Sequence, residues 1–287
     1  MKILISIKAG ILRSLVSWKG IVIVWFVSLL LVSLVALPMK ASLQNGLNSS
    51  MVTEKLREGI NIDVFADLSS SFTNLASYFS KGLFMLMLAG FLINSFLSGG
   101  LFSSLIADHV RFSTSEFFRA SSKNFWSFLL ISLTMSLIII VLAVLIIVVP
   151  VTMLSQGKGI SDYIVFGSGV FLTSVFLFVL IIVLLAADYA RAWQIIQTKN
   201  YGFKVIGFGF SQTFRTFYSS YPMMLILLII QILFMWLVLT ILPGIKPTTF
   251  GGIIILFLLS QFLFIIRIIL KTWRYGSVTR MMEINTI

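Results

Sequence analysis

Two aspartates at the ends of apolar segments are the residues of this chain best placed to do chemistry. Asp108 lies three residues before Arg111 in the sequence ADHVR, and Asp188 lies three residues before Arg191 in the sequence ADYAR. In a helix this spacing puts both side chains on one face, where they can form an interfacial ion pair. A proton-coupled or partner-binding site is the alternative interpretation. The structural ion pair is favoured, because pairing and snorkelling lower the cost of a charge at the end of a span.

Sequence motifs of the common enzyme classes are absent. The chain has no cysteine and one histidine, His109, and it has no phosphate-binding glycine loop, no HExxH and no GxSxG. A lipid-modifying enzyme would have Asp108, His109 and Asp188 as its only catalytic candidates. We therefore expect a protein that is not an enzyme and that uses no metal and no cofactor.

The composition indicates a helical membrane protein. Of 287 residues, 59% are hydrophobic and only 10% are charged, which lies outside the range of water-soluble domains. The net charge of +12 does not predict a nucleic-acid partner, because the basic residues are scattered between apolar segments and form no continuous stripe. Anionic lipid headgroups are the expected partner.

Six segments are long and apolar enough to cross a bilayer, which needs about 20 residues. The expected fold is all-α, a polytopic membrane protein with spans at residues 20–37, 82–107, 128–150, 163–187, 222–242 and 250–270. Most lysines and arginines fall at the two termini and in the connections at 108–127 and 188–221. Because basic residues accumulate on the cytoplasmic side, both termini are expected to be cytoplasmic.

Short amphipathic segments precede the first, third and fifth spans, at 2–18, 113–126 and 201–218. Each is expected to lie in the inner interface as a helix. The basic residues expected to contact lipid or a partner are Arg119, Lys123, Lys204, Arg215 and, near the end of the last span, Arg267. Within one transmembrane domain of 1–287, the chain then divides into three pseudo-repeated hairpin units, at about 1–111, 112–191 and 192–287.

Polar residues within the spans are few. Asn94, Ser95 and Ser98 precede two glycines in the second span, and Gln261 lies in the sixth. Helix packing is the default interpretation, and the lining of a cavity is the alternative. The extracytoplasmic loop at 38–81 is expected to contain short amphipathic helices.

Several short stretches together resemble a poorly characterised family of bacterial six-span membrane proteins, which is loosely similar to the membrane domain found beside some glycerophosphodiester phosphodiesterases. The matching stretches are Val35-Ala36-Leu37-Pro38, Ser50 with Leu56-Arg57-Glu58-Gly59, Phe117-Phe118-Arg119-Ala120 with Asn124-Phe125-Trp126, and Asp188-Tyr189-Ala190-Arg191. The resemblance implies six helices in a bacterial cytoplasmic (inner) membrane. It carries no phosphodiesterase activity, because that domain is not present in this sequence.

Two functional hypotheses follow. The first is a non-enzymatic membrane module that binds lipid or another membrane protein, since the unusual residues gather at the interfaces. The second is a transporter or the permease subunit of a transport complex, with an ATPase partner docked on the connection at 192–218. In that case the stretch Asn94 to Gly100 of the second span, which includes Ser95 and Ser98, would line the path with Gln261 and Arg267 of the sixth.

Overall fold

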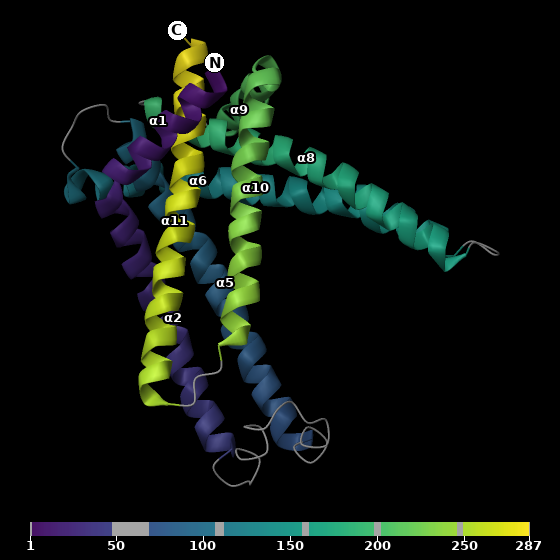
Figure 1. Cartoon of the computed structure of the whole chain (residues 1–287). Coiled ribbons are helices and arrows are strands. Elements are labelled where there is room, and N and C mark those ends of the chain that lie inside the picture. Colours follow the sequence, from purple (N-terminus) through teal and green to yellow (C-terminus); the bar gives the residue numbers. More distant parts are fainter. Residues whose placement is uncertain are drawn as a thin grey trace. The chain divides into compact units, whose positions relative to one another are not determined.

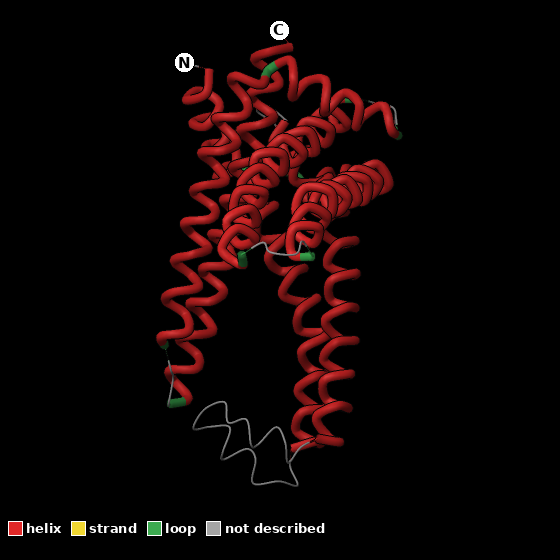
Figure 2. Tube along the Cα trace, turned by 90° about the vertical axis from the view of Figure 1, so that its right-hand side faces the viewer, coloured by secondary structure: helices red, strands yellow, loops and turns green. Residues whose placement is uncertain are grey.

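The computed structural model of the chain describes residues 2–47, 69–106, 112–156, 161–197, 202–245 and 249–286. All regular structure in these ranges is helical, as Figure 2 shows. The elements in chain order are α1 (Lys2–Val16), α2 (Trp18–Leu47), α5 (Ser69–Ile106), α6 (Thr114–Ala143), a π-helical segment (Val144–Val148), α7 (Val149–Ser155), α8 (Asp162–Ile196), α9 (Phe203–Arg215), α10 (Phe217–Ile241), a 3₁₀ turn (Leu242–Gly244) and α11 (Phe250–Thr286).

Six helical stretches of the described chain are long and apolar enough to cross a membrane. They are Trp18–Pro38, Ser80–Ile106, Thr114–Ser155, Tyr163–Ile196, Phe217–Ile241 and Phe250–Asn285. The predicted all-helical fold and the six spans are confirmed, and the chain is a multi-pass membrane protein by the length and composition of these helices. A helix suits this environment because it satisfies its own backbone hydrogen bonds where no water is available.

Two helix boundaries at the connection between the first and second spans differ from the predicted ones. Helix α2 continues through Pro38, where the sequence predicted the end of a span, and reaches Leu47. A proline removes one backbone hydrogen bond, and a membrane helix can absorb that loss by local adjustment. Helix α5 already begins at Ser69, so the connection at 38–81 is shorter than expected. The short helices predicted within it fall mainly on 48–68, outside the described residues.

The second amphipathic segment is not a separate helix. Residues 113–126 and 128–150 were expected as an interfacial helix followed by a span, but α6 runs without a break from Thr114 to Ala143. Nothing between these segments breaks a helix, since the junction holds neither glycine nor proline. The irregularity lies further on, where the π-helical segment Val144–Val148 ends two residues before Pro150. A proline ring disturbs the hydrogen bonds of the turn before it, which accounts for a π-bulge at this point.

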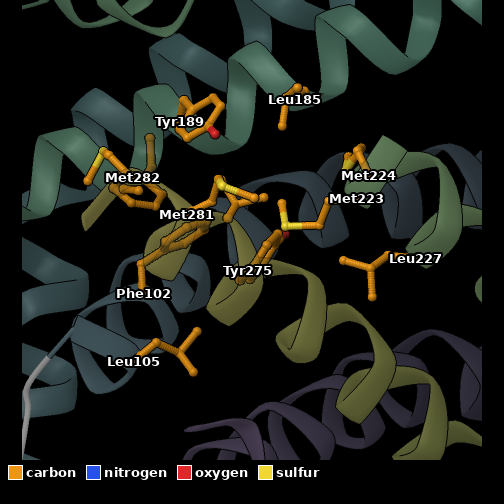
Figure 3. Close-up of a cluster of buried hydrophobic side chains, with 13 residues drawn as sticks. Phe102, Leu105, Leu185, Tyr189, Met223, Met224, Leu227, Tyr275, Met281 and Met282 are labelled. Carbon is orange, nitrogen blue, oxygen red and sulfur yellow. The ribbon is translucent and has the colours of Figure 1, made fainter. Parts of the chain in front are cut away.

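The helices form two compact units, Ile23–Asn94 in one and Met1–Val22 with Ser95–Ile287 in the other. In the smaller unit, α2 and α5 pack where Gly90 faces Leu31. The larger unit contains a core built by α5, α6, α8, α10 and α11, several of whose side chains are labelled in Figure 3. Its centre is the ring of Tyr275, which stacks on Phe102 with ring centroids 4.4 Å apart.

Burial in the larger unit is concentrated at one end of each long helix. In α8, none of the described side chains at 163–180 is buried, whereas residues 185–190 all are. In α11, burial begins at Ile268 and continues to Met282. We call this region, together with α1 and α9, the packed end. The other ends expose large apolar side chains, as expected for surface in contact with lipid tails.

Helix α1 packs lengthwise on the last part of α11, so that the two termini lie close together (Figure 1). The contact face of α1 consists of small residues, Ser6, Gly10 and Ser14. A Cβ atom added at Gly10 would lie 2.6 Å from the backbone nitrogen of Ser277. Arg13 also binds Glu283 through two hydrogen bonds, of 2.8 and 3.0 Å. The small face therefore allows the backbones to approach closely enough for this ion pair.

The Gly10 contact provides a test of this packing. We expect Gly10→Ala to destabilise the protein by about 1–3 kcal/mol, because the new methyl group overlaps the α11 backbone and α1 must shift. The matched control is Gly207→Ala in α9, where an added Cβ would meet no atom within 4 Å. The control should stabilise by roughly 0.5–1 kcal/mol through helix propensity. Thermal unfolding in detergent measures both variants, and equal tolerance would show that α1 does not contact α11 at Gly10.

Candidate functional site: a buried charge cluster beside exposed basic helices

Asp188 lies at the packed end, fully buried between two arginines. Its Oδ1 is 3.1 Å from Nη1 of Arg191, one helical turn further along α8. Its Oδ2 is 2.9 Å from Nε of Arg274 on α11. The first contact is a hydrogen bond, whereas the second is a close ion pair without hydrogen-bond alignment. The i, i+3 spacing in the sequence thus corresponds to a real pair, and a second cation from another helix joins it.

The cluster connects four helices. Arg191 also donates from Nη2 to the hydroxyl of Ser132 on α6, at 3.1 Å. On the α11 side, the guanidinium carbon of Arg274 and the ammonium of Lys271 lie 5.3 and 5.8 Å from the ring centroid of Tyr275. Because Tyr275 stacks on Phe102 of α5, charge and aromatic contacts tie α5, α6, α8 and α11 together.

Tyr189, the residue after Asp188, makes a second polar contact between helices. Its hydroxyl hydrogen-bonds to that of Ser220 on α10 and lies 3.4 Å from that of Thr216, at the junction of α9 and α10. Thr216 is where α9 ends and α10 begins. The sequence ADYAR therefore joins α8 to α11 through its aspartate and to α10 through its tyrosine.

The first copy of this sequence, with Asp108, His109 and Arg111, lies outside the described residues. In the neighbouring helix α6, Arg119 and Lys123 are exposed. The guanidinium of Arg119 lies 3.8 Å from the carboxylate of Glu116. Since both side chains are more than half exposed, this surface pair contributes little to stability.

The polar residues of the second span lie at a helix contact. Ser95 and Ser98 are buried, whereas Asn94 is exposed. One residue after Ser98, a Cβ added at Gly99 would lie 3.2 Å from Cα of Ser121 on α6. Close approach of two helices is the role that small residues commonly have in membranes.

The two polar residues predicted in the last span lie outside the buried cluster. Gln261 is half-buried and Arg267 is exposed, and both precede the buried part of α11. Arg274 is the residue of this helix that joins the cluster, and the sequence interpretation missed it. The sequence feature that could have identified Arg274 is the basic stretch Lys271 to Arg274, which has no aspartate beside it. An arginine near the end of a span without a local acid can pair with an acid from another helix.

Two helices of the packed end carry exposed apolar and basic side chains. On α9, Phe203 and Phe214 are 70% and 63% exposed, and Lys204 and Arg215 beside them are also exposed. The opposite face of α9 packs on α8, where a Cβ added at Gly209 would lie 3.0 Å from that of Ala190. On α1, the exposed face carries Leu4, Ile5, Lys8, Leu12, Leu15 and Val16, followed by Trp18 and Lys19 at the start of α2.

Fold and site together define a six-span helical membrane protein with a buried ion cluster. No protein-family model, no curated protein and no solved structure matches the chain. The resemblance to a bacterial six-span family therefore rests only on the short stretches quoted above.

Replacing Asp188 tests the energetic role of the cluster. We expect Asp188→Asn to destabilise the protein by roughly 3–5 kcal/mol, because it leaves two largely buried guanidinium groups without their counter-ion. Glu116→Gln removes the carboxylate of the exposed pair with Arg119 and should cost less than about 1 kcal/mol. Thermal unfolding of both variants in one detergent gives the comparison. A loss for Asp188→Asn no larger than for Glu116→Gln would contradict the structural role.

Proposed function

We propose that this protein is a non-enzymatic module of the bacterial inner membrane that binds anionic lipid headgroups through α1 and α9 at its packed end. The observation that carries the proposal is the exposed face of α9, on which aromatic and basic side chains stand together. Phenylalanine favours the acyl boundary and lysine or arginine favours phosphate, so a helix with both on its outer face suits the plane of a membrane surface.

The geometry of α9 supports this orientation in detail. At 100° per residue, Phe203, Phe214 and Gly207 fall within about 40° of one another, and Lys204 and Arg215 follow at about 100–120°. One edge of the exposed face is thus aromatic and the other is basic. A helix lying in the interface with its aromatic edge toward the acyl chains holds its basic edge at the level of the headgroups.

Helix α1 supports the same location from the other side of the unit. Its small face is used against α11, so its large apolar side chains are left uncovered within the described chain. Exposure of such a face to water would cost a free energy of about 25 cal/mol per Å² of apolar surface. Immersion in the headgroup and acyl boundary removes that cost, while Lys8 and Lys19 remain available to lipid phosphate.

The proposal includes an orientation and a repeat. The packed end carries the basic residues of α1, α9 and the beginning of α6, and this charge bias supports a cytoplasmic location for both termini. Three units of helical hairpins, at about 1–111, 112–191 and 192–287, would then present basic segments to the same leaflet. The bacterial origin follows the family resemblance alone.

Charge reversal on α9 tests the proposal. With the detergent-solubilised protein in an equimolar mixture of phosphatidylglycerol and phosphatidylcholine, native mass spectrometry counts the lipids of each kind that are retained. We expect Lys204→Glu with Arg215→Glu to lower the retained ratio of anionic to zwitterionic lipid roughly tenfold or more, since each basic residue near a membrane surface contributes about 1 kcal/mol. Lys204→Glu alone should give an intermediate loss.

The matched control is Lys81→Glu, which reverses an exposed charge near the beginning of the second span. This residue lies at the predicted outer end of its span, away from the packed end, so its reversal should leave the lipid ratio unchanged. An equal decrease in both single variants would show that only the total charge matters and would overturn the assignment to α9.

A further inference from the structure

The first turns of α6 are held in one orientation by their contact with α5. The side chains of Phe117, Ser121, Asn124 and Phe128 are buried, and their spacing places them on one line along the helix. A Cβ atom added at Gly100 of α5 would lie 2.6 Å from Oγ of Ser121 and 2.7 Å from the ring of Phe117. Such close packing leaves little room for α6 to rotate. The opposite face of these turns therefore points outward.

Five side chains on the outward part of these turns are exposed, namely those of Phe118, Arg119, Ser122, Lys123 and Trp126. Residues three and four apart are neighbours on a helix surface, with Cβ atoms about 5–6 Å apart. Arg119, Ser122 and Lys123 have this spacing, so two cations and a hydroxyl surround one point of the surface. All three side chains donate hydrogen bonds of the kind that phosphate oxygens accept. Because they are exposed, a ligand reaches them without a cavity.

Aromatic rings continue the surface beside this point. The rings of Phe118 and Phe125 lie next to Phe96 of α5, with centroids 6.4 and 6.2 Å away. Trp126 contacts Phe125 at 5.3 Å between centroids and is 73% exposed. A tryptophan ring favours the boundary between lipid headgroups and acyl chains. The basic side chains therefore border an aromatic surface suited to that boundary.

The exposed side chains of α6 change along the helix in the order that a membrane boundary imposes. Arg119 and Lys123 come first, Trp126 follows, and the large exposed side chains beyond it, such as Leu133 and Leu137, are apolar. At 1.5 Å per residue, the two basic residues precede Trp126 by about 10 and 5 Å along the axis. With the tryptophan at the boundary, the cations lie at the level of the lipid phosphates.

We infer that Arg119, Ser122 and Lys123 bind the phosphate of one anionic phospholipid, whose acyl chains lie along Phe118 and Trp126. The inference rests on the proposed binding of anionic lipid, and it extends that binding from α1 and α9 to the first turns of a membrane span.

The spacing of the basic residues distinguishes this site from α9. Lys204 and Arg215 are 11 residues apart (215 − 204), which corresponds to about 16 Å along α9. Two cations at that distance cannot share one phosphate, so α9 attracts a charged surface as a whole. Arg119 and Lys123 are one turn apart and can share one phosphate. The site on α6 is therefore expected to hold a single lipid.

Native mass spectrometry of the full chain, in detergent with equimolar phosphatidylglycerol and phosphatidylcholine, tests this stoichiometry. We expect Arg119→Gln with Lys123→Gln to retain one phosphatidylglycerol fewer and to bind it roughly tenfold or more weakly. Both side chains are exposed, so the variant should fold. Lys81→Glu gives the same change in net charge and is the matched control, which should keep this lipid. No loss in the double variant, or an equal loss in the control, overturns the site.

Glu116 provides a test in the opposite direction. Its carboxylate lies 3.8 Å from the guanidinium of Arg119, and both side chains are largely exposed, so it competes with a lipid phosphate for that cation. Glu116→Gln should strengthen the retention of phosphatidylglycerol roughly two- to fivefold. The gain should disappear in the Arg119→Gln protein, because the two residues act on the same lipid. A gain that persists there would reflect net charge alone and would contradict the site.

The variants of α6 and α9 separate this inference from the proposed function. If only the Lys204→Glu, Arg215→Glu protein loses anionic lipid, the site on α6 is overturned and the proposed function stands. If only the Arg119→Gln, Lys123→Gln protein loses it, the assignment to α9 fails and the site on α6 stands.

Inorganic phosphate identifies the source of the phosphate group. Compared with chloride at the same ionic strength, it should not displace the retained phosphatidylglycerol, because it lacks the acyl chains that contact Phe118 and Trp126. Displacement by inorganic phosphate would assign the site to the free ion and overturn the lipid assignment.

Discussion

The ion pairs of Asp188 determine which of the apolar helices pack against one another. Helices in lipid gain little from apolar contact alone, because the acyl chains are as apolar as leucine. A buried carboxylate, in contrast, requires its cations at hydrogen-bonding or ion-pair distance. Arg191 supplies one from the same helix, and Arg274 supplies the other from α11. The hydroxyl of Ser132 extends the network to α6, so one acid specifies the relative placement of three helices.

Small residues make that placement possible. Gly10 lies against the backbone of α11, Gly209 against α8, and Gly99 against α6. At each position a side chain would separate the helices and lengthen the polar contacts nearby. The use of small faces for packing has a second consequence. Larger apolar and basic side chains of α1 and α9 are left on the outside, a combination that suits a membrane interface.

The packed end thus holds two groups of basic side chains that differ in their exposure to solvent. Lys204 and Arg215 are exposed, so salt screens them and they act over about one Debye length. Arg191 and Arg274 are largely buried around a fixed carboxylate, where screening is weak. The first setting suits attraction to a charged surface, and the second holds α8 and α11 in place relative to each other. Both lie in the part of the larger unit where α1 packs on α11 and the two termini come together.

The sequence by itself determined the helical class, the six apolar stretches and the pairing of Asp188 with Arg191, because each depends on composition or on contacts within one helical turn. It also predicted the amphipathic segments at 2–18 and 201–218. It did not predict that α6 is continuous, although no residue at the junction breaks a helix. It also did not predict that α2 passes through Pro38, since membrane context overrides that local signal. Only the tertiary structure decided that Arg274, which is 86 residues from Asp188 along the chain (274 − 188), shares its carboxylate. A pair of residues on different helices produces no periodic pattern in the sequence. Asp188 and Arg274 come together because a buried charge must be neutralised.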